Sequence, residues 1–500
     1  MNKEELLALY DKLKGNAKRA IEKRDYKFSL DCLGGLSYIA YTFGFRYTDD
    51  EAEEMLNRIS QQIKKRETLE DATGTHRCVM IDSLSEYHGG LTVQYLRAIK
   101  AAGWDVLYLS DTDLNQRHRA DLRKELASNP KLKAVSVPRF KRGLKRCQYM
   151  YDTIMDYNPE NVFIHIAPHA AYPAMVCYAL PPQTKKYLIN YTDHSFLLGT
   201  GCVDRSFEFT NYGVSISWRY RHIEESNMFM LPYYSFSDDV PFKGFPEIVE
   251  GKTVIFSGGN YWKITDTEGT FFLMVKRILD ACPNAVVLFA GRGNDIPVKS
   301  FIKQYGIGER FVLLGWRNDI AALFDHCDIY LSTYPSPGGL MSQFAARASK
   351  PIVAYDPKGS CITETLTCQV KQASISINDM DVLIREISRL VEDVDYRKAR
   401  GNEINSCVLS VEEFNEKFKM AVEEDRPTGL PYKINRNIGL KSETKILNTI
   451  KVHEEGHGVE NQLVAFMGLR AMMILSFSDV WRYKKKLLKQ YWNLIINRLK

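Results

Sequence analysis

The sequence lacks the short motifs that mark several common protein classes. Its ten cysteines include no CxxC pair, which argues against a zinc ribbon or a thioredoxin-type redox site. It contains neither the GxxxxGK[ST] loop of P-loop ATPases nor a complete GxGxxG dinucleotide-binding motif. Several cysteines lie inside apolar, strand-like runs, which favours buried free thiols and a reducing compartment.

The sequence also lacks a secretion signal and a long apolar segment. Its first twenty residues mix charged residues with leucine and contain no apolar signal-peptide core. The longest apolar candidate, 463–477, is shorter than the roughly 18 residues that a membrane-spanning helix needs, and it includes Arg470. We therefore expect a cytoplasmic protein without a membrane-spanning helix.

Neither sign of charge dominates the sequence. The net charge of +6 is spread over 500 residues, which is too weak to indicate a nucleic-acid partner. A hydrophobic content of 45% and a charged content of 26% are typical of a well-packed chain, and the length corresponds to about three folding units. We expect no nucleic acid among the partners.

Two long segments, 75–240 and 241–428, alternate apolar runs with helical patterns. Continuous apolar strands separated by helices are typical of a parallel sheet covered on both faces. The fold class is therefore α/β, with two Rossmann-like doubly wound domains and helical extensions at 1–74 and 429–500. The expected strands are 78–84, 105–110, 134–138, 162–167, 187–191 and 214–218 in the first domain, and 253–259, 285–291, 311–315, 328–333, 351–355 and 374–377 in the second.

Ligands of open α/β sheets bind at the carboxyl ends of the strands, beside helix N-termini. In the first domain, His88, Gly89 and Gly90 follow the strand 78–84 at the turn into a helix. Two glycines there let a ligand approach the backbone and leave helix N–H groups free for an anionic or hydroxyl-rich ligand. The alternative is a glycine pair that only makes the turn.

Two similar sites occur in the second domain. One is the pair Gly258 and Gly259, followed by Lys263, and the other is the loop 336–340, which leads into a helix. Arg292 follows a third strand on the same edge. Glycine turns, a helix N-terminus and two cations are groups that hold a diphosphate. Because they can neutralise its charge, we expect no essential metal and no other cofactor.

These two domains, together with the run from Leu313 to Asp356, resemble the GT-B glycosyltransferases, in particular the family-4-like (group 1) branch. The likeness covers residues 75–425 and is densest from 253 to 356. It implies that the second domain holds a nucleotide-diphosphate sugar as donor and the first holds the acceptor. The implied activity is that of a hexosyltransferase acting on a glycan or lipid-linked acceptor, in surface polysaccharide biosynthesis.

The resemblance also implies roles for individual residues. The loop 315–320 would border the base, and the triplet His88, Gly89 and Gly90 would lie on the acceptor side. The residues that would hold the diphosphate are Gly258, Gly259, Lys263 and Arg292, and those against the sugar and phosphates are Ser336, Gly338, Gly339 and Leu340.

One departure from the family pattern concerns its Glu-x7-Glu signature. Aligned on the glycine loop, the two acidic positions fall on Ser336 and Phe344. Glu364, after the next strand, is an alternative contact for the ribose. The departure leaves both a retaining and an inverting transfer open, and it motivates an alternative function as a non-catalytic glycan-binding or partner subunit of another transferase.

Candidate bases follow two strands of the first domain. His169 comes after the strand 162–167, and Asp193 and His194 come after the strand 187–191. An inverting transfer needs a base within hydrogen-bond reach of the acceptor hydroxyl, and an aspartate beside a histidine can orient it. Hydrogen-bonded structural histidines are the alternative. The pattern places His165 in the core and keeps Glu208 as a further carboxylate candidate.

Two features near the C-terminus suggest other functions. Residues 453–457 satisfy HExxH, the zinc-peptidase pattern, but Gly456 weakens a helix there and few residues follow. We expect a solvated loop instead. Residues 481–500 form a basic, aromatic helical stripe, which is typical of a helix on an anionic membrane surface. Such a helix would place the protein peripherally on the inner face of the membrane; packing against the first domain is the alternative.

Overall fold

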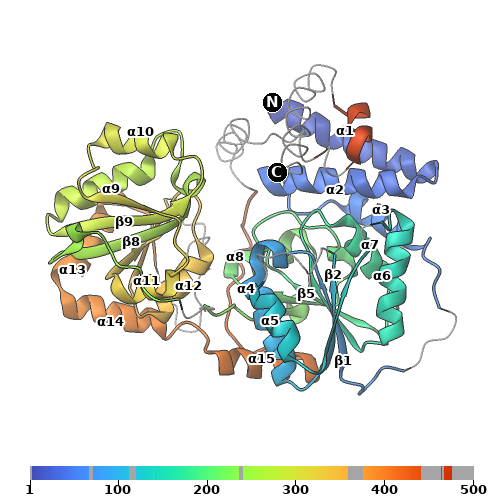
Figure 1. Cartoon of the computed structure of the whole chain (residues 1–500). Helices are drawn as coiled ribbons and strands as arrows, with labels where there is room; N and C mark the ends of the chain where they lie inside the picture. Colours follow the sequence, from blue (N-terminus) through green and yellow to red (C-terminus); the bar gives the residue numbers. More distant parts are fainter. Residues whose placement is uncertain are drawn as a thin grey trace, which may run out of the picture. The chain divides into compact units, whose positions relative to one another are not determined.

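A computed structural model describes residues 3–66, 71–111, 120–138, 140–235, 240–357 and 375–440, together with Leu463 and 467–475. The chain divides into two compact units, drawn in Figure 1. The first unit consists of Met1–Val93, Gly103–Arg205 and Gly439–Lys500, and the second of Gln94–Ala102 and Ser206–Ile438. The boundaries expected from the sequence, at 74, 240 and 428, stay a prediction.

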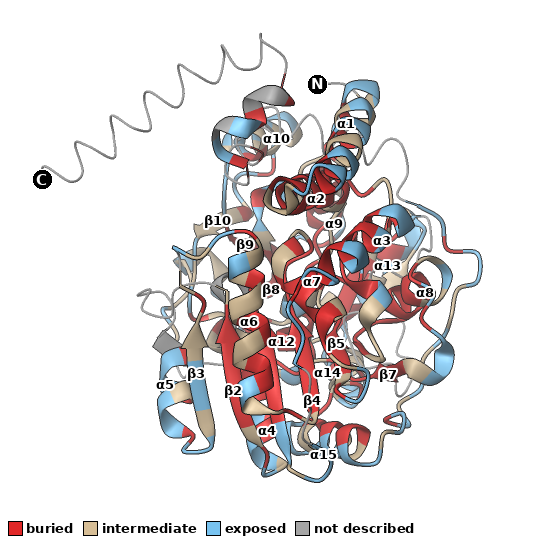
Figure 2. Ribbon diagram, turned by 90° about the vertical axis from the view of Figure 1, so that its right-hand side faces the viewer, coloured by how far each residue is buried: buried red, intermediate tan, exposed pale blue. Residues whose placement is uncertain are grey.

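The first sheet has seven strands in the order β3-β2-β1-β4-β5-β6-β7. The pairs β1–β2, β1–β4, β2–β3, β4–β5 and β6–β7 are parallel. Figure 2 shows β2 and β4 buried, whereas the edge strand β3 is largely exposed or half-buried. The strands are β1 Arg77–Asp82, β2 Asp105–Ser110, β3 Leu132–Ser136, β4 Asn161–His165, β5 Lys185–Ile189, β6 Arg205–Glu208 and β7 Met228–Met230.

The helices between these strands are α4 Ser85–Ala101, α5 Ala120–Ser128, α6 Leu144–Tyr157, α7 Ala171–Ala179 and α8 Asn211–Tyr220. The last of these corrects the strand expected at 214–218. The Thr210 hydroxyl accepts a hydrogen bond from the Gly213 backbone N–H and caps the helix, and the Ser215 hydroxyl bonds back to the Asn211 carbonyl. The periodicity of the sequence could not distinguish a strand from a helix here, because both the apolar and the small polar residues of this short run are buried.

Three helices precede the first sheet, as the sequence predicts: α1 Lys3–Glu22, α2 Tyr26–Phe43 and α3 Asp50–Ser60. The α1 side chains at helical spacing, such as Leu6, Tyr10 and Leu13, are buried. Helix α2 ends at Gly44, whose left-handed φ of 69° lets its N–H reach the Ala40 carbonyl. Helices α2 and α3 pack against α7, so the extension shares a core with the first sheet (Figure 1).

The described residues near the C-terminus return to α1 and α2. Leu463 lies against Gly35, and the Arg470 guanidinium pairs with Asp25 at 2.6 Å. The Lys12 ammonium donates to the Ile474 carbonyl at 2.5 Å. The side chains of this run that belong to the core of the first unit are Leu463, Met467, Ala471, Ile474 and Leu475. Among the described residues, no helix combines the length and the apolar character needed to cross a membrane.

The second sheet has six strands in the order β10-β9-β8-β11-β12-β13, all paired in parallel. Two parallel sheets flanked by helices confirm the expected fold class. The strands are β8 Thr253–Asn260, β9 Ala285–Arg292, β10 Phe311–Gly315, β11 Ile329–Leu331, β12 Ile352–Tyr355 and β13 Ser376–Ile377.

The helices of the second unit that follow β8 are α9 Thr270–Ala281, α10 Ile296–Tyr305, α11 Ile320–His326, α12 Gly339–Arg347, α13 Met380–Glu392, α14 Val394–Asn405 and α15 Val411–Glu423. Helices α9, α10 and α13 pack on one face of this sheet and α11, α12 and α14 on the other, whereas Phe414 and Phe418 of α15 pack against Tyr95. Short 3-10 helices are η2 Thr200–Cys202, η3 Glu225–Asn227, η4 Glu247–Val249, η5 Tyr261–Ile264 and η8 Gly468–Met473. One apolar cluster on each face of the sheet forms the core of this unit.

Candidate functional site

The carboxyl edge of the second sheet begins with a close approach between β8 and β9. Strand β8 runs through Gly258 and Gly259, so the glycine pair lies in the strand rather than in the turn after it. Gly259 has a φ of 146°, which favours glycine, and a side chain on its neighbour Gly291 would collide with the Gly259 carbonyl. The glycines therefore let the two strand ends lie close together and keep their edge open to a ligand.

Lys263 connects this edge to the glycine-rich loop. It lies on η5, directly after β8, and is half-buried. Its ammonium donates to the Pro337 carbonyl at 3.0 Å, and its own carbonyl accepts from the Ser336 N–H at 3.3 Å. Burial lowers the pKa of Lys263 to about 8, from an ordinary value of 10.5. The structure thus brings together Lys263 and the loop 336–340, two features that the sequence places far apart.

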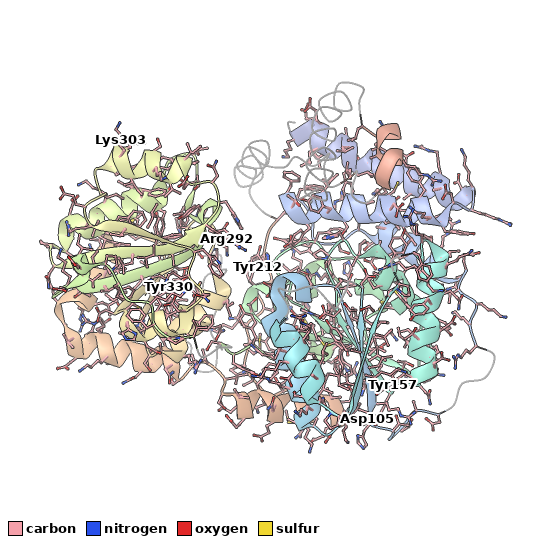
Figure 3. The ribbon with its side chains drawn as sticks, in the orientation of Figure 1. Asp105, Tyr157, Tyr212, Arg292, Lys303 and Tyr330 are labelled. Carbon is pink, nitrogen blue, oxygen red and sulfur yellow. The ribbon has the colours of Figure 1, made fainter. Side chains whose placement is uncertain are left out.

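The loop leads into the N-terminus of α12. Gly338 precedes the helix, and no side chain caps its first turn. Uncapped backbone N–H groups and the helix dipole attract an anion at this point. Leu340, in the first turn, is 50% exposed, whereas Gly338 is buried and packs over the hydroxyl of Tyr330. Figure 3 labels Tyr330 in this unit.

Arg292 is the last residue of β9, and its side chain is exposed (Figure 3). The register of the sheet pairs Arg292 with Asn260 of β8, and Gly291 with Gly259. Neighbouring parallel strands end at the same edge of a sheet. Arg292, at the end of β9, and Lys263, on η5 after β8, therefore lie along the same edge. The second unit therefore carries two cations and the uncapped N-terminus of α12 along a single edge.

The loop after β10 presents an exposed tryptophan. Trp316 is 60% exposed, although large aromatic side chains are usually covered. The next residues are rigid, because the Arg317 guanidinium binds the carboxylate of Asp319 through two hydrogen bonds of 2.6 and 2.7 Å. Hydrogen bonds from Arg317 and from the Lys243 backbone N–H, against the opposing effect of burial, lower the pKa of Asp319 to about 2. The sequence indicated this loop but did not single out Trp316.

The two positions of the altered acidic signature have different surroundings. Phe344 belongs to the core of the unit and stacks on Phe324, with ring centroids 6.3 Å apart. Ser336 is half-buried, and its carbonyl accepts a 2.6 Å hydrogen bond from the Thr333 hydroxyl. Phe344 therefore has a packing role that an acidic residue would not fill. Glu364, the alternative ribose contact, lies outside the described residues.

In the first unit, Asp193 and His194 follow β5 and form a contact. The Nδ1 atom of His194 lies 3.2 Å from the Asp193 carboxylate, and the His194 side chain is 47% exposed whereas Asp193 is buried. A buried carboxylate beside an exposed imidazole can fix the orientation of the ring and leave the other nitrogen accessible. This geometry suits a base that acts on a hydroxyl group.

The other candidate bases are less accessible. His169 packs edge-on against the ring of Tyr38, with centroids 5.8 Å apart, and burial lowers its pKa to about 4, so the ring is neutral at pH 7. His165 is fully buried, with Nδ1 3.3 Å from the Asp82 carboxylate, as expected for a core histidine. Glu208 is also fully buried and accepts a hydrogen bond from the Ser206 hydroxyl at 2.6 Å.

The triplet His88, Gly89 and Gly90 lies inside α4 rather than in the turn before it. The helix begins at Ser85, because the turn is already closed by the Asp82 carboxylate, which accepts from the Leu84 N–H at 2.7 Å. The expected position of the triplet in the strand-to-helix turn was therefore wrong, although it lies in the first turns of the helix that follows β1.

No group of three His, Cys, Asp or Glu side chains within the described ranges is placed to hold a metal ion. Asp379 and Asp381 have a DxD spacing after β13, but Asp379 caps α13 and Asp381 pairs with Arg277 at 2.5 Å. The absence of an essential metal stays a prediction. Residues 453–457 and 481–500 lie outside the described residues, so the zinc-peptidase and membrane-helix hypotheses cannot be placed on the structure.

Two parallel-sheet domains, the second with a glycine-rich and cationic carboxyl edge, define a protein of the GT-B fold. Residues 251–393 match the family described as glycosyl transferases group 1. The match lies within the second unit and agrees with the resemblance found in the sequence. Comparison with curated protein sequences finds no match.

Solved structures support the fold. An O-GlcNAc transferase mutant from Thermobaculum terrenum is 14% identical, with 84% of this chain and 83% of that chain covered and a TM-score of 0.54. A glycosyltransferase from Rickettsia africae is 15% identical over 70% of this chain and 98% of that chain, with a TM-score of 0.52. HepE from Anabaena, in complex with UDP, is 13% identical over 70% and 99%, with a TM-score of 0.51.

Proposed function

We propose that the protein transfers a hexose from a nucleotide-diphosphate sugar to a glycan or lipid-linked acceptor. The supporting observation is the position of Lys263, whose ammonium lies at the Pro337 carbonyl beside the uncapped N-terminus of α12. An ammonium and free helix N–H groups bind the oxygens of a diphosphate together. The carbonyl that Lys263 now contacts is a neutral acceptor, and a diphosphate would replace it with a charged one.

The donor nucleotide in this proposal lies along the edge from β11 to β10. The diphosphate contacts Lys263 and α12, with Arg292 as a second cation. Trp316, exposed at the end of β10, offers its face to the base. UDP is the first nucleotide to test, because HepE, which shares the fold, has been crystallised with UDP. No essential metal enters this proposal, since two cations and a helix N-terminus already oppose the charge.

On the acceptor side, His194 is the proposed base. It is exposed and oriented by Asp193, whereas His169 is largely covered by Tyr38 and its surroundings. A positioned base takes the proton of the attacking hydroxyl as the bond to the sugar forms, while the bond from the sugar to the diphosphate breaks and the nucleoside diphosphate leaves. The proposed acceptor, and a place in surface polysaccharide biosynthesis, come from the family resemblance and not from a particular contact.

The second candidate function is that of a non-catalytic GT-B subunit that binds a glycan or a partner transferase. The observation in its favour is the altered acidic signature, with Ser336 at one position and the core residue Phe344 at the other. Such a subunit could retain nucleotide binding or lose it, but it would not turn over a donor.

Turnover of nucleotide sugars separates the two functions. Purified protein is incubated with UDP-, GDP- and TDP-sugars, and the released nucleotide is measured with and without glycan or lipid-linked acceptors. The transferase predicts release of one nucleotide, with slow hydrolysis when water replaces the acceptor. Absence of turnover with every donor would favour the non-catalytic subunit. A matched Lys263→Ala sample controls for contaminating enzymes.

A further inference from the structure

The N-terminal helices contact both loops that carry the candidate bases. The Ser37 hydroxyl on α2 donates to the Pro168 carbonyl at 2.5 Å, directly before His169. In the other loop, the Ser195 hydroxyl donates to the Tyr41 carbonyl at 2.9 Å, directly after His194. The extension is thus bonded to the residues adjoining each candidate base.

A buried carboxylate makes a further connection between the extension and the loop after β5. Glu53, on α3, accepts a 2.9 Å hydrogen bond from the Gly199 N–H and a 3.3 Å bond from the Gly201 N–H. The Tyr178 hydroxyl on α7 also donates to it. Burial raises the pKa of Glu53, and these donors act in the opposite direction. One side chain of the extension therefore satisfies two backbone groups of the loop after β5.

The loop depends on this carboxylate because it has little regular structure of its own. Gly199 adopts a left-handed conformation, with φ of 87°, and the loop contains only the single 3-10 turn η2. Backbone N–H groups buried in such a loop need acceptors from elsewhere. Both oxygens of a carboxylate accept hydrogen bonds, whereas a neutral amide of the same size offers only one acceptor oxygen.

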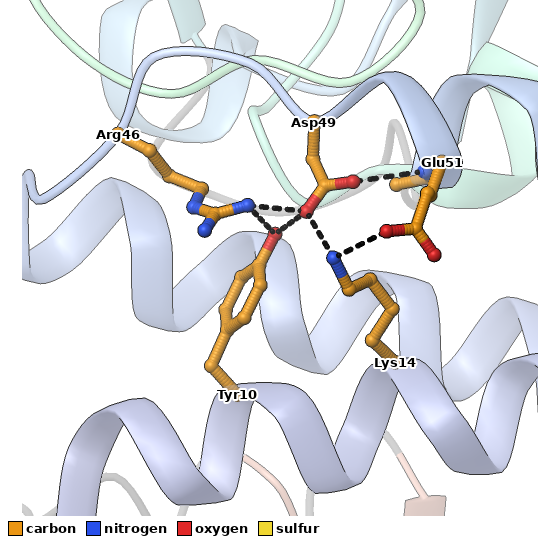
Figure 4. A network of polar contacts seen from close by, with 6 residues as sticks. Tyr10, Lys14, Arg46, Asp49 and Glu51 are labelled. Carbon is orange, nitrogen blue, oxygen red and sulfur yellow. Dashed lines mark hydrogen bonds and ion pairs between the residues drawn. The ribbon is translucent and has the colours of Figure 1, made fainter. Parts of the chain in front are cut away.

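The position of Glu53 is in turn set by α1. Asp49 caps α3, accepting from the Ala52 N–H at 3.2 Å, and lies one turn before Glu53. Figure 4 shows Asp49 at the centre of a polar network. It accepts from the Tyr10 hydroxyl at 2.6 Å and pairs with Arg46 at 2.5 Å and with Lys14 at 3.2 Å. Two of these donors come from α1, so α1 and α3 are fixed as one body.

We propose that Glu53 is a positioning residue, which holds the loop of residues 193–201 in the conformation that presents His194. The proposal assigns a role in the reaction to the N-terminal helical extension, and it rests on the proposed function of the first unit as the acceptor side. Glu53 itself does not touch substrate. It acts through the backbone of Gly199 and Gly201.

The test begins with hydrogen exchange, which needs no substrate. In Glu53→Gln the amides of Gly199 and Gly201 should exchange about tenfold faster than in wild type, the effect of one lost charge-assisted hydrogen bond. The matched control is Glu54→Gln, the exposed neighbour on the same helix, which should change neither amide. Exchange of the α2 amides should stay unchanged in both variants. Unaltered exchange at Gly199 and Gly201 would overturn the proposal.

Kinetics then distinguish positioning from mere support of the fold. Per folded molecule, Glu53→Gln should lower kcat about tenfold and raise KM for the acceptor, with nucleotide affinity unchanged. Normal kcat and acceptor KM despite faster exchange would overturn the proposal. If Glu53→Gln does not fold, Tyr178→Phe, which removes one donor and keeps the carboxylate, should give the same pattern to a smaller degree; wild-type kinetics there would overturn it.

The two proposals fail in different ways. If the wild-type protein shows no turnover but Glu53→Gln still speeds exchange at the amides of Gly199 and Gly201, the transferase function is contradicted. The contact between Glu53 and these two amides is then still supported. An active wild type whose Glu53→Gln variant matches it in both readouts contradicts only the positioning role.

Discussion

The ammonium group of Lys263 donates a 3.0 Å hydrogen bond to the carbonyl oxygen of Pro337, and it thereby joins the end of β8 to the loop that precedes α12. The two residues are 74 positions apart in the chain. Their contact places a cation against the uncapped start of a helix, and both groups favour the same kind of ligand. An anion with several oxygens can bind both at once.

Removing either cation should weaken donor binding. Lys263→Ala and Arg292→Ala each delete a charge-assisted contact worth about 1.5–3 kcal/mol, which corresponds to roughly 10- to 150-fold in affinity. Isothermal titration with UDP and GDP measures the loss. Lys303→Ala, on an exposed lysine of α10 in the same unit, is the control and should bind as wild type does. Unchanged affinity in both cation variants would contradict the assignment.

Donor affinity should fall as the pH rises above about 8. The pKa of Lys263 is lowered to about 8, so its ammonium is largely charged at pH 7 and largely neutral at pH 9. If only the charged form holds the diphosphate, the dissociation constant of a UDP-sugar should rise about tenfold from pH 7 to pH 9. Lys263→Arg stays charged throughout this range and should show a flat profile. A wild-type profile as flat as that of the arginine variant would rule out this role of Lys263.

Trp316→Ala should weaken the binding of nucleotides but not the binding of inorganic pyrophosphate. Stacking of a base on an aromatic side chain is worth about 1–3 kcal/mol, or roughly 5- to 150-fold in affinity. Trp316→Tyr should recover most of the loss, because it keeps an aromatic face. An equal loss for UDP and pyrophosphate would mean that the substitution disturbs the edge of the sheet instead of a base contact.

His194→Ala should lower turnover by about 10²–10⁴-fold, since it removes the proposed base. Nucleotide affinity should change little, because the diphosphate residues belong to the second unit. Asp193→Asn should reduce the rate less, through loss of orientation of the imidazole. Steady-state kinetics with donor and acceptor measure both effects.

Near-normal turnover of His194→Ala would transfer the role to His169 or Asp193. His169 has its pKa lowered to about 4 by burial, so an enzyme that uses it as base should lose activity only as the pH falls through about 4. A rate profile that keeps its activity down to about pH 4 would therefore support His169 as the base.

Much of the fold could be predicted because buried parallel strands carry continuous apolar runs. The expected strand 105–110 coincides with β2, and 253–259 falls within β8. Strands β6 and β7, of four and three residues, were missed. The short run 214–218 was assigned to a strand because apolar and polar residues alternate in it. The same residues are equally compatible with the buried helix α8.

The parts of the candidate site that lie on one local motif could be predicted in the same way. Glycines after a strand, with a lysine a few residues later, indicate Lys263 without knowledge of the fold. Glu53 could not be found from the sequence, because its partner Gly199 lies 146 residues away and a glutamate on an amphipathic helix usually faces solvent. Only tertiary packing turns it into a buried acceptor.

The most direct test of the account is a crystal structure of the protein with bound UDP or a UDP-sugar. The account predicts the diphosphate at the carboxyl edge of the second sheet, within hydrogen-bond distance of the Lys263 ammonium and of backbone N–H groups in the first turn of α12, with the base near Trp316. A nucleotide bound elsewhere, or a diphosphate that contacts neither Lys263 nor α12, would contradict it.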